Sequence, residues 1–151
     1  MKKLKKNLLF LFIAVLLGAF VGDYITTNYG KSIPVLNRND SFYILQEGVY
    51  NSEEQMQDNV KNLFPKIVIN RDNKYHVYVG ITKSEEVLEK LFNIYKDLGY
   101  TIYTKEEDIN NVEFIKLSTE LDELIKTASD NTEILKIEEL VLSSYEQKIS
   151  K

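Results

Sequence analysis

The sequence of 151 residues contains no cysteine, no tryptophan, one histidine and two prolines. Without cysteine, the chain can form no disulfide bond, no thiol nucleophile and no cysteine-ligated zinc or iron–sulfur site. A single histidine leaves an imidazole-based metal site without a second such ligand. Serine, histidine and aspartate are all present, but no G-x-S-x-G motif positions a serine nucleophile. We therefore expect that the protein is not an enzyme and that it binds neither a metal ion nor a cofactor.

Basic residues are scarce beyond the N-terminus. Lys2, Lys3, Lys5 and Lys6 are the only charges before Asp23, and from there onward 15 basic residues stand against 23 acidic ones. The difference, 15 − 23, gives this portion a formal charge of −8. Nucleic-acid binding depends on neutralising phosphates with lysine and arginine. A portion this acidic favours neither nucleic acid nor anionic lipid as a partner, whereas a neutral glycan remains compatible.

One long apolar run is present, LLFLFIAVLLGAFVG at residues 8–22. Its 15 residues fall short of the roughly 20 that span a bilayer, but flanking polar residues can extend it. The preceding lysines orient such a helix with its N-terminus in the cytoplasm. We predict a cytoplasmic basic stub at 1–7, a transmembrane signal-anchor helix at 8–25 and an extracytoplasmic linker at 26–41. A cleaved signal peptide and a buried helix of a soluble protein are the alternatives.

A phrase of the sequence occurs twice, as FYILQEGVYNSEE from Phe42 and as KYHVYVGITKSEE from Lys74. Five of twelve aligned positions are identical at an offset of 32 residues: Tyr43/Tyr75, Gly48/Gly80, Ser52/Ser84, Glu53/Glu85 and Glu54/Glu86. A repeat of this kind predicts two similar supersecondary units. The two Glu pairs resemble the paired carboxylates of glycosidases. Their position after a capping serine is explained more simply by the dipole of a helix N-terminus.

Each copy predicts the same order of strand, helix and strand. We expect the elements at 43–47, 52–65 and 66–69 in the first copy, a polar turn at 70–74, and the elements at 75–79, 84–99 and 100–105 in the second. The sum is a βαββαβ, split-βαβ or ferredoxin/RNP-like α+β fold. It has a four-stranded antiparallel sheet with two helices on one face, and the first and third strands at its centre.

Alternation along the strands assigns side chains to the two faces of this sheet. Leu45, Val77 and Val79 should point toward the helices, and Ile102 should do so in the last strand. The opposite face should carry Ile44, Gln46, His76 and Tyr78 at its middle, with Tyr103 toward one edge, and should be uncovered. Alanine at Leu45 or Val77 should therefore cost far more stability than alanine at Ile44 or Tyr78. Glu47 is turned toward the helices, and we expect it at a strand end where its carboxylate reaches water.

The two strand motifs resemble the SPOR (sporulation-related) domain. They are Tyr-x-Leu-Gln-x-Gly-x-Tyr at 43–50 and Tyr-His-Val-Tyr-Val-Gly at 75–80, each followed by Ser-Glu-Glu. The resemblance covers about residues 42–106 and implies a doubled βαββαβ fold, commonly held by an N-terminal membrane helix, that binds septal peptidoglycan stripped of stem peptides. The sequence departs from the family pattern at Glu47, at His76 where arginine is frequent, and at Ile81 and Thr82 where proline and an aromatic residue are usual.

Residues 107–151 form a second unit. Two apolar stripes at helical spacing, separated by Ser129-Asp130-Asn131, predict an acidic helical hairpin. The first stripe holds Val112, Ile115, Leu117, Leu121, Leu124 and Ile125, and the second holds Ile134, Leu135, Ile137, Leu140, Val141 and Tyr145. The hairpin either completes the fold by packing on the domain or binds a second copy or a partner.

The resemblance and the anchor together indicate a single-pass cell-membrane protein whose extracytoplasmic domain binds peptidoglycan glycan strands in cell division or sporulation. The expected glycan contacts are the outward residues of the sheet: Ile44, Gln46, His76, Tyr78 and Tyr103. The main alternative is an envelope or divisome protein-interaction module that uses the sheet or the C-terminal helices. An RNA-binding sheet of similar topology is a third possibility, against which the charge and the orientation argue.

Overall fold

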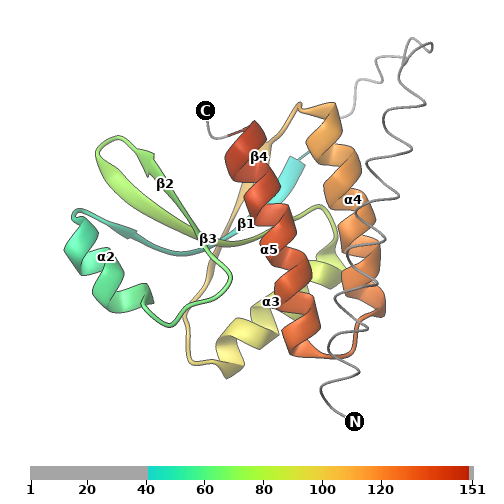
Figure 1. The fold of residues 1–151 in the computed structure, drawn as a ribbon, viewed down its shortest axis with the longest axis horizontal. Coiled ribbons are helices and arrows are strands. Elements are labelled where there is room, and N and C mark those ends of the chain that lie inside the picture. The colour runs from blue at the N-terminus through green and yellow to red at the C-terminus, as the bar shows by residue number, and fades with distance from the viewer. Residues whose placement is uncertain (1–40, 150–151) are drawn as a thin grey trace, which may run out of the picture. The chain divides into compact units, whose positions relative to one another are not determined.

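The computed structural model describes residues 41–149 (Figure 1). The predicted stub, anchor helix and linker lie outside these residues, apart from Ser41, which opens the first strand. No helix between residues 41 and 149 is both long enough and apolar enough to cross a membrane. The elements follow in the order β1 (Ser41–Tyr50), α2 (Glu53–Val60), β2 (Ile67–Arg71), β3 (Lys74–Thr82), α3 (Glu85–Asp97), β4 (Tyr103–Asp108), α4 (Val112–Thr127) and α5 (Asn131–Lys148).

The strands form one antiparallel sheet in the order β2-β3-β1-β4. The βαββαβ order and the central position of the first and third strands are therefore confirmed. Ser52 and Ser84 cap α2 and α3 as expected, since their hydroxyls accept hydrogen bonds from the backbone N–H groups of Gln55 and Val87. Gly99, at a φ of 87°, follows the end of α3 in the left-handed conformation that glycine adopts most easily.

The pairing of β1 with β3 shows that the sequence repeat is structural. Leu45 pairs with Gly80, and the residues equivalent to them at the offset of 32, Val77 and Gly48, pair with each other. The two residues without a partner in the ladder, Glu47 and Val79, are also equivalent. A Cβ at Gly80 would lie 3.1 Å from a methyl group of Leu45. Glycine at this position thus lets the two central strands approach each other across a bulge.

Some boundaries differ from the prediction. β2 and β3 extend into the expected turn at 70–74, which shrinks to Asp72 and Asn73, both with positive φ as in a tight hairpin turn. Helix α2 ends at Val60, five residues before Pro65, and the last strand begins at Tyr103 instead of residue 100. Glu47 lies at the bulge inside β1, where its carboxylate accepts a hydrogen bond from the hydroxyl of Tyr50 at 2.8 Å.

Helices pack on both faces of the sheet, so the expectation that one face is free of helices is wrong. Leu45 and Val77 point toward α2 and α3, as expected. The opposite face carries α5, with α4 beside it, and Figure 1 shows α5 crossing in front of the strands. Ile44 and Tyr78 on this face are fully buried, like Leu45 and Val77. The predicted difference in stability between inward and outward truncations is therefore also wrong.

The helical hairpin is confirmed, and it packs on the domain. Helix α4 buries a stripe shifted from the predicted one, because Phe114 and Ser118 are buried while Val112 and Leu124 are exposed. Phe114 reaches the ring of Phe42 on β1 at a centroid distance of 5.4 Å. In α5 the predicted apolar stripe is largely right. The same stripe also contains Glu138, a charged residue that the apolar pattern does not include.

Candidate functional site

The five predicted site residues lie on one face of the sheet. Gln46 pairs with Tyr78 on one side and with Tyr103 on the other, and directly opposite residues of a ladder share a face. Nδ1 of His76 lies 3.4 Å from Oε1 of Gln46, and its ring meets that of Tyr78 edge-on at 6.4 Å. Ile44 is opposite Lys105 on β4. The face assignment therefore holds, whereas the role of these residues in glycan binding stays a prediction.

The C-terminal hairpin divides this face into two halves. Ile44 and Tyr78 belong to the covered half, where the ring of Tyr78 contacts that of Tyr145 on α5 at 6.3 Å. No ligand can reach either side chain while α5 lies there. Tyr78 is one of the expected glycan contacts, and in this structure it belongs to the hydrophobic core instead.

The other half of the face reaches solvent. We define the open strip as Gln46, Val49, Arg71, His76, Tyr103 and Lys105. Tyr103 is its most exposed aromatic side chain, with 63% of its surface accessible, and it stands directly across the ladder from Gln46. Val49 pairs with His76 and is also exposed. The strip thus combines an accessible aromatic ring, an amide and an imidazole.

A polar cluster borders the open strip. Nζ of Lys105 donates to the hydroxyl of Tyr78 at 2.7 Å and lies 3.3 Å from a carboxylate oxygen of Glu107. The other oxygen of Glu107 accepts from the hydroxyl of Tyr145 at 3.0 Å and lies 3.9 Å from the guanidinium of Arg71. Arg71 and Glu107 belong to the two edge strands, so their contact shows that the face is concave here. The two bulges supply the extra twist that this curvature requires.

The sequence pattern does not predict Arg71, Lys105 or Glu107 as neighbours of the site. Lys105 could have been found, because it is two residues beyond Tyr103 on one strand and therefore shares its face. Arg71 had no such signal, because it was placed in a turn. These cations act on His76, whose pKa is lowered by burial first and then by Lys105 and Arg71. The imidazole is therefore neutral at neutral pH, able to donate one hydrogen bond and accept another.

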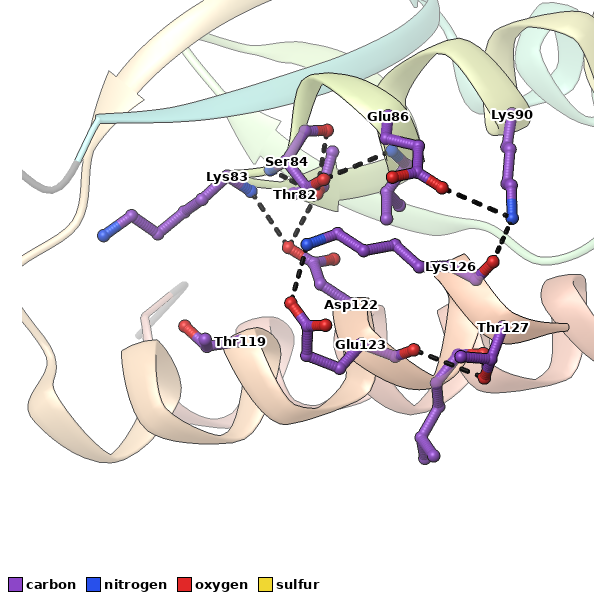
Figure 2. A network of polar contacts seen from close by, with 12 residues as sticks. Thr82, Lys83, Ser84, Glu86, Lys90, Thr119, Asp122, Glu123, Lys126 and Thr127 are labelled. Carbon is purple, nitrogen blue, oxygen red and sulfur yellow. Dashed lines mark hydrogen bonds and ion pairs between the residues drawn. The ribbon is translucent and has the colours of Figure 1, made fainter.

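A second polar network joins the hairpin to the turn between β3 and α3 (Figure 2). Oδ2 of Asp122 on α4 accepts hydrogen bonds from the hydroxyl of Thr82 at 2.8 Å and from the N–H of Lys83 at 3.3 Å. Deeper in the interface, Oε1 of Glu138 on α5 accepts from the N–H of Ile81 at 2.8 Å. Both carboxyl groups are buried, and the second oxygen of each has no hydrogen-bond partner among the described residues.

Burial raises the pKa of Asp122 to about 6, against the opposing effect of its bond from Thr82. Burial also raises the pKa of Glu138 well above its usual range, and the charge of Asp122 adds to that rise. Glu138 has no accessible surface and Asp122 has only 3%, so neither carboxyl group is open to a substrate. Their geometry indicates attachment of the hairpin. Residues 41–149 also contain no cluster of three or more acidic or histidine side chains that could hold a metal ion.

Comparison with known proteins gives one similarity in structure. No protein-family model matches the sequence, and no curated protein matches it. Among solved structures, the chain is similar to the solution structure of the peptidoglycan-binding domain of the B. subtilis cell wall lytic enzyme CwlC. The alignment covers 48% of this chain and 98% of that one, with 19% sequence identity and a TM-score of 0.41. A similarity at this level does not identify a ligand for the present chain.

Proposed function

We propose that this protein is a membrane-anchored, extracytoplasmic SPOR-like module that binds the glycan strands of peptidoglycan on its open strip. The observation that carries the proposal is the exposed ring of Tyr103 directly opposite Gln46, with His76 beside it. The module binds its ligand without converting it. Its place of action is the septum, in division or sporulation, as the sequence resemblance implies.

The chemistry of the strip suits a sugar. A pyranose ring offers apolar C–H faces and a rim of hydroxyl groups. The ring of Tyr103 can lie against the C–H face, while the amide of Gln46 both donates to and accepts from hydroxyl groups. Neutral His76 supplies a further donor and acceptor. The aromatic ring that stacks on the sugar is therefore Tyr103, which is accessible, and not Tyr78, which is buried.

The double variant Gln46→Ala/Tyr103→Ala should bind sacculi roughly fivefold to a hundredfold more weakly than wild type, since loss of one stacking contact and one hydrogen-bonding group removes on the order of 1–3 kcal/mol. Both side chains reach solvent, so the thermal midpoint should hardly change. The measurement is a pull-down of the full-length chain, in mild detergent, with purified sacculi. Each variant is monitored by its thermal unfolding.

Glu53→Gln provides a matched control, because Glu53 is exposed in the first turn of α2 and lies away from the open strip. Its binding should equal that of wild type. A folded double variant that still binds sacculi like wild type would move the glycan site off this strip. The outer surface of the C-terminal hairpin would then lead as a surface for an envelope protein partner.

The topology can be tested independently. A reporter that is active only outside the cytoplasm, fused after Lys151, should be active, and the full-length fusion should sediment with membranes. The reason is the lysine-rich N-terminus followed by the apolar run at 8–22, which orients a spanning helix with its N-terminus inside. A reporter active only in the cytoplasm would contradict the proposed location. A shortened product in the medium would indicate cleavage of the anchor.

A further inference from the structure

Arg71, one of the residues of the open strip, presents its guanidinium group to solvent. Its side chain is 50% exposed, and its ion pair with Glu107, at 3.9 Å, is longer than a hydrogen bond. No hydrogen bond from its guanidinium to any residue between 41 and 149 is present. A guanidinium presents donors in a planar fork that matches the two oxygens of a carboxylate. The guanidinium can therefore donate hydrogen bonds to a carboxylate of a ligand.

The surroundings of Arg71 favour an anion. Lys105 adds a second cation, 35% exposed, and it lies 4.6 Å from the ring centre of Tyr78. Glu107 is the carboxylate of the cluster, and the hydroxyl of Tyr145 and Nζ of Lys105 already hold it in place. Asp72 also acts on the strip, but its effect on the pKa of His76 is smaller than that of Lys105 or of Arg71. The cluster is thus a local positive site on a domain whose overall charge is strongly negative.

We infer that Arg71, assisted by Lys105, binds a carboxylate carried by the ligand of the open strip. This inference rests on the proposed function, since the ligand considered is a peptidoglycan glycan strand. Each muramic acid residue of such a strand carries a lactyl group. Its carboxyl group is either joined to a peptide as an amide or free as a carboxylate. Only the free form offers two anionic oxygens to the Arg71 fork.

The placement of the two cations agrees with this assignment. Arg71 shares its face with His76, because β2 and β3 pair Ile69 with His76 and Arg71 with Lys74 two residues further along. Lys105 follows Tyr103 on the same face of β4. Both cations contact Glu107, so they lie together, and a sugar on Tyr103 and Gln46 would meet them on the same side. A substituent on that sugar need not leave the strip to meet Arg71.

The inference is tested with two preparations of sacculi. Both are treated with amidase to remove stem peptides, and one is then treated with carbodiimide and methylamine to convert its free carboxylates into neutral amides. Full-length wild type should bind the carboxylate form roughly tenfold more tightly than the amide form, the size of one charge-assisted hydrogen-bonded pair. The preference should shrink as the salt concentration rises.

Arg71→Gln should abolish the preference and bind both preparations as wild type binds the amide form. Arg71→Lys, which keeps the charge and loses the fork, should retain part of it. Lys61→Gln is the matched control, because it removes an exposed charge at the end of α2 and should leave the preference intact. A preference that survives in Arg71→Gln, or is absent in wild type, would overturn the carboxylate subsite and leave the proposed function standing. Failure of wild type to bind either preparation would overturn both.

Discussion

Replacing Tyr78 with alanine should lower the free energy of unfolding by on the order of 3–5 kcal/mol, the range found for large buried aromatic residues. The side chain is fully buried between the sheet and α5, and its ring packs edge-on against that of Tyr145 at 6.3 Å. Its hydroxyl accepts a hydrogen bond from Lys105 at 2.7 Å. The truncation would leave a cavity and would remove one of the two partners of the Lys105 ammonium, the other being Glu107. Urea denaturation followed by circular dichroism measures the loss.

Two further variants make the result specific. Tyr103→Ala removes the same side chain from the exposed half of the same face, and it should cost less than about 0.5 kcal/mol. Tyr78→Phe removes the hydroxyl alone and should cost about 1 kcal/mol. Equal urea midpoints for Tyr78→Ala and Tyr103→Ala would show that α5 does not cover this face in solution. Because the proposed site excludes Tyr78, a loss of glycan binding in Tyr78→Ala would follow from unfolding.

The repeat made most of the fold predictable from sequence. Two copies of one phrase specify two similar units, and the pairing of Leu45 with Gly80 and Val77 with Gly48 shows that the copies meet symmetrically at the centre of the sheet. The bulges were not predictable. An extra residue at Glu47 and at Val79 shifts the alternation beyond it, so that Val49 lies opposite His76 and Ile81 lies opposite Ile44.

The sequence also could not decide what covers the second face. Alternation correctly placed Ile44 and Tyr78 opposite Leu45 and Val77, but it could not show whether that face meets water or another element. Both the sheet and the C-terminal hairpin carry apolar side chains that have to be buried. The structure buries one set against the other, which leaves only the part of the face around Gln46 and Tyr103 open to solvent.

Two of the positions at which the sequence differs from the SPOR pattern contact the hairpin. At the position where the SPOR pattern usually has proline, this chain has Ile81, whose backbone N–H donates to Glu138. Proline has no N–H and could not make this bond. The next residue, Thr82, replaces an aromatic residue and donates its hydroxyl to Asp122. The two substitutions therefore supply the groups through which α4 and α5 are attached.

Glu138 shows why sequence alone does not predict whether a charged residue of a helix is buried or exposed. Glu138 and Glu139 stand side by side in α5, and the apolar pattern leaves both outside the buried stripe. β2 pairs with β3 only as far as Tyr78, so that edge of β3 lacks a strand partner from Val79 onward. The hydroxyl of Tyr95 donates to the carbonyl of Val79, and Glu138 accepts from Ile81. The carboxyl group of Glu138 is therefore buried because it replaces the hydrogen-bond partner that a neighbouring strand would have given Ile81.

Lowering the pH from about 8 to about 5 should stabilise the folded domain, contrary to the usual behaviour of paired carboxylates. The pKa values of Asp122 and Glu138 are higher in the folded chain than in the unfolded one, mainly through burial. A group of this kind binds its proton more tightly when folded. The contribution of such a group to the stability of the fold is complete below its pKa in the unfolded chain. It is lost as the pH rises through its pKa in the folded chain. For Asp122 the loss falls between about pH 4 and about 6, and for Glu138 it continues to higher pH.

The size of the effect follows from the shift at Asp122. A rise from 3.8 to about 6 corresponds to about 3 kcal/mol over the whole window, from roughly 1.4 kcal/mol per pKa unit, and about half of this falls between about pH 8 and about pH 5. The charged groups that act on the pair are few: Lys126, which lowers the pKa of Asp122, and the two carboxyl groups themselves. The hydroxyl of Tyr95 is close to Glu138 but stays protonated, since burial raises its pKa too. The interface therefore lacks a cation that would neutralise Glu138.

Glu138→Gln should raise the free energy of unfolding at about pH 8 and flatten its dependence on pH. Glutamine keeps an oxygen that can accept from Ile81 and cannot ionise, so it removes the cost of a buried charge without removing the bond. Glu139→Gln, at an exposed neighbouring position, should leave the pH profile of wild type unchanged. The measurement is urea denaturation at a series of pH values. A wild-type stability that rises from about pH 5 to about pH 8, with Glu138→Gln following the same curve, would show that these carboxyl groups ionise without cost.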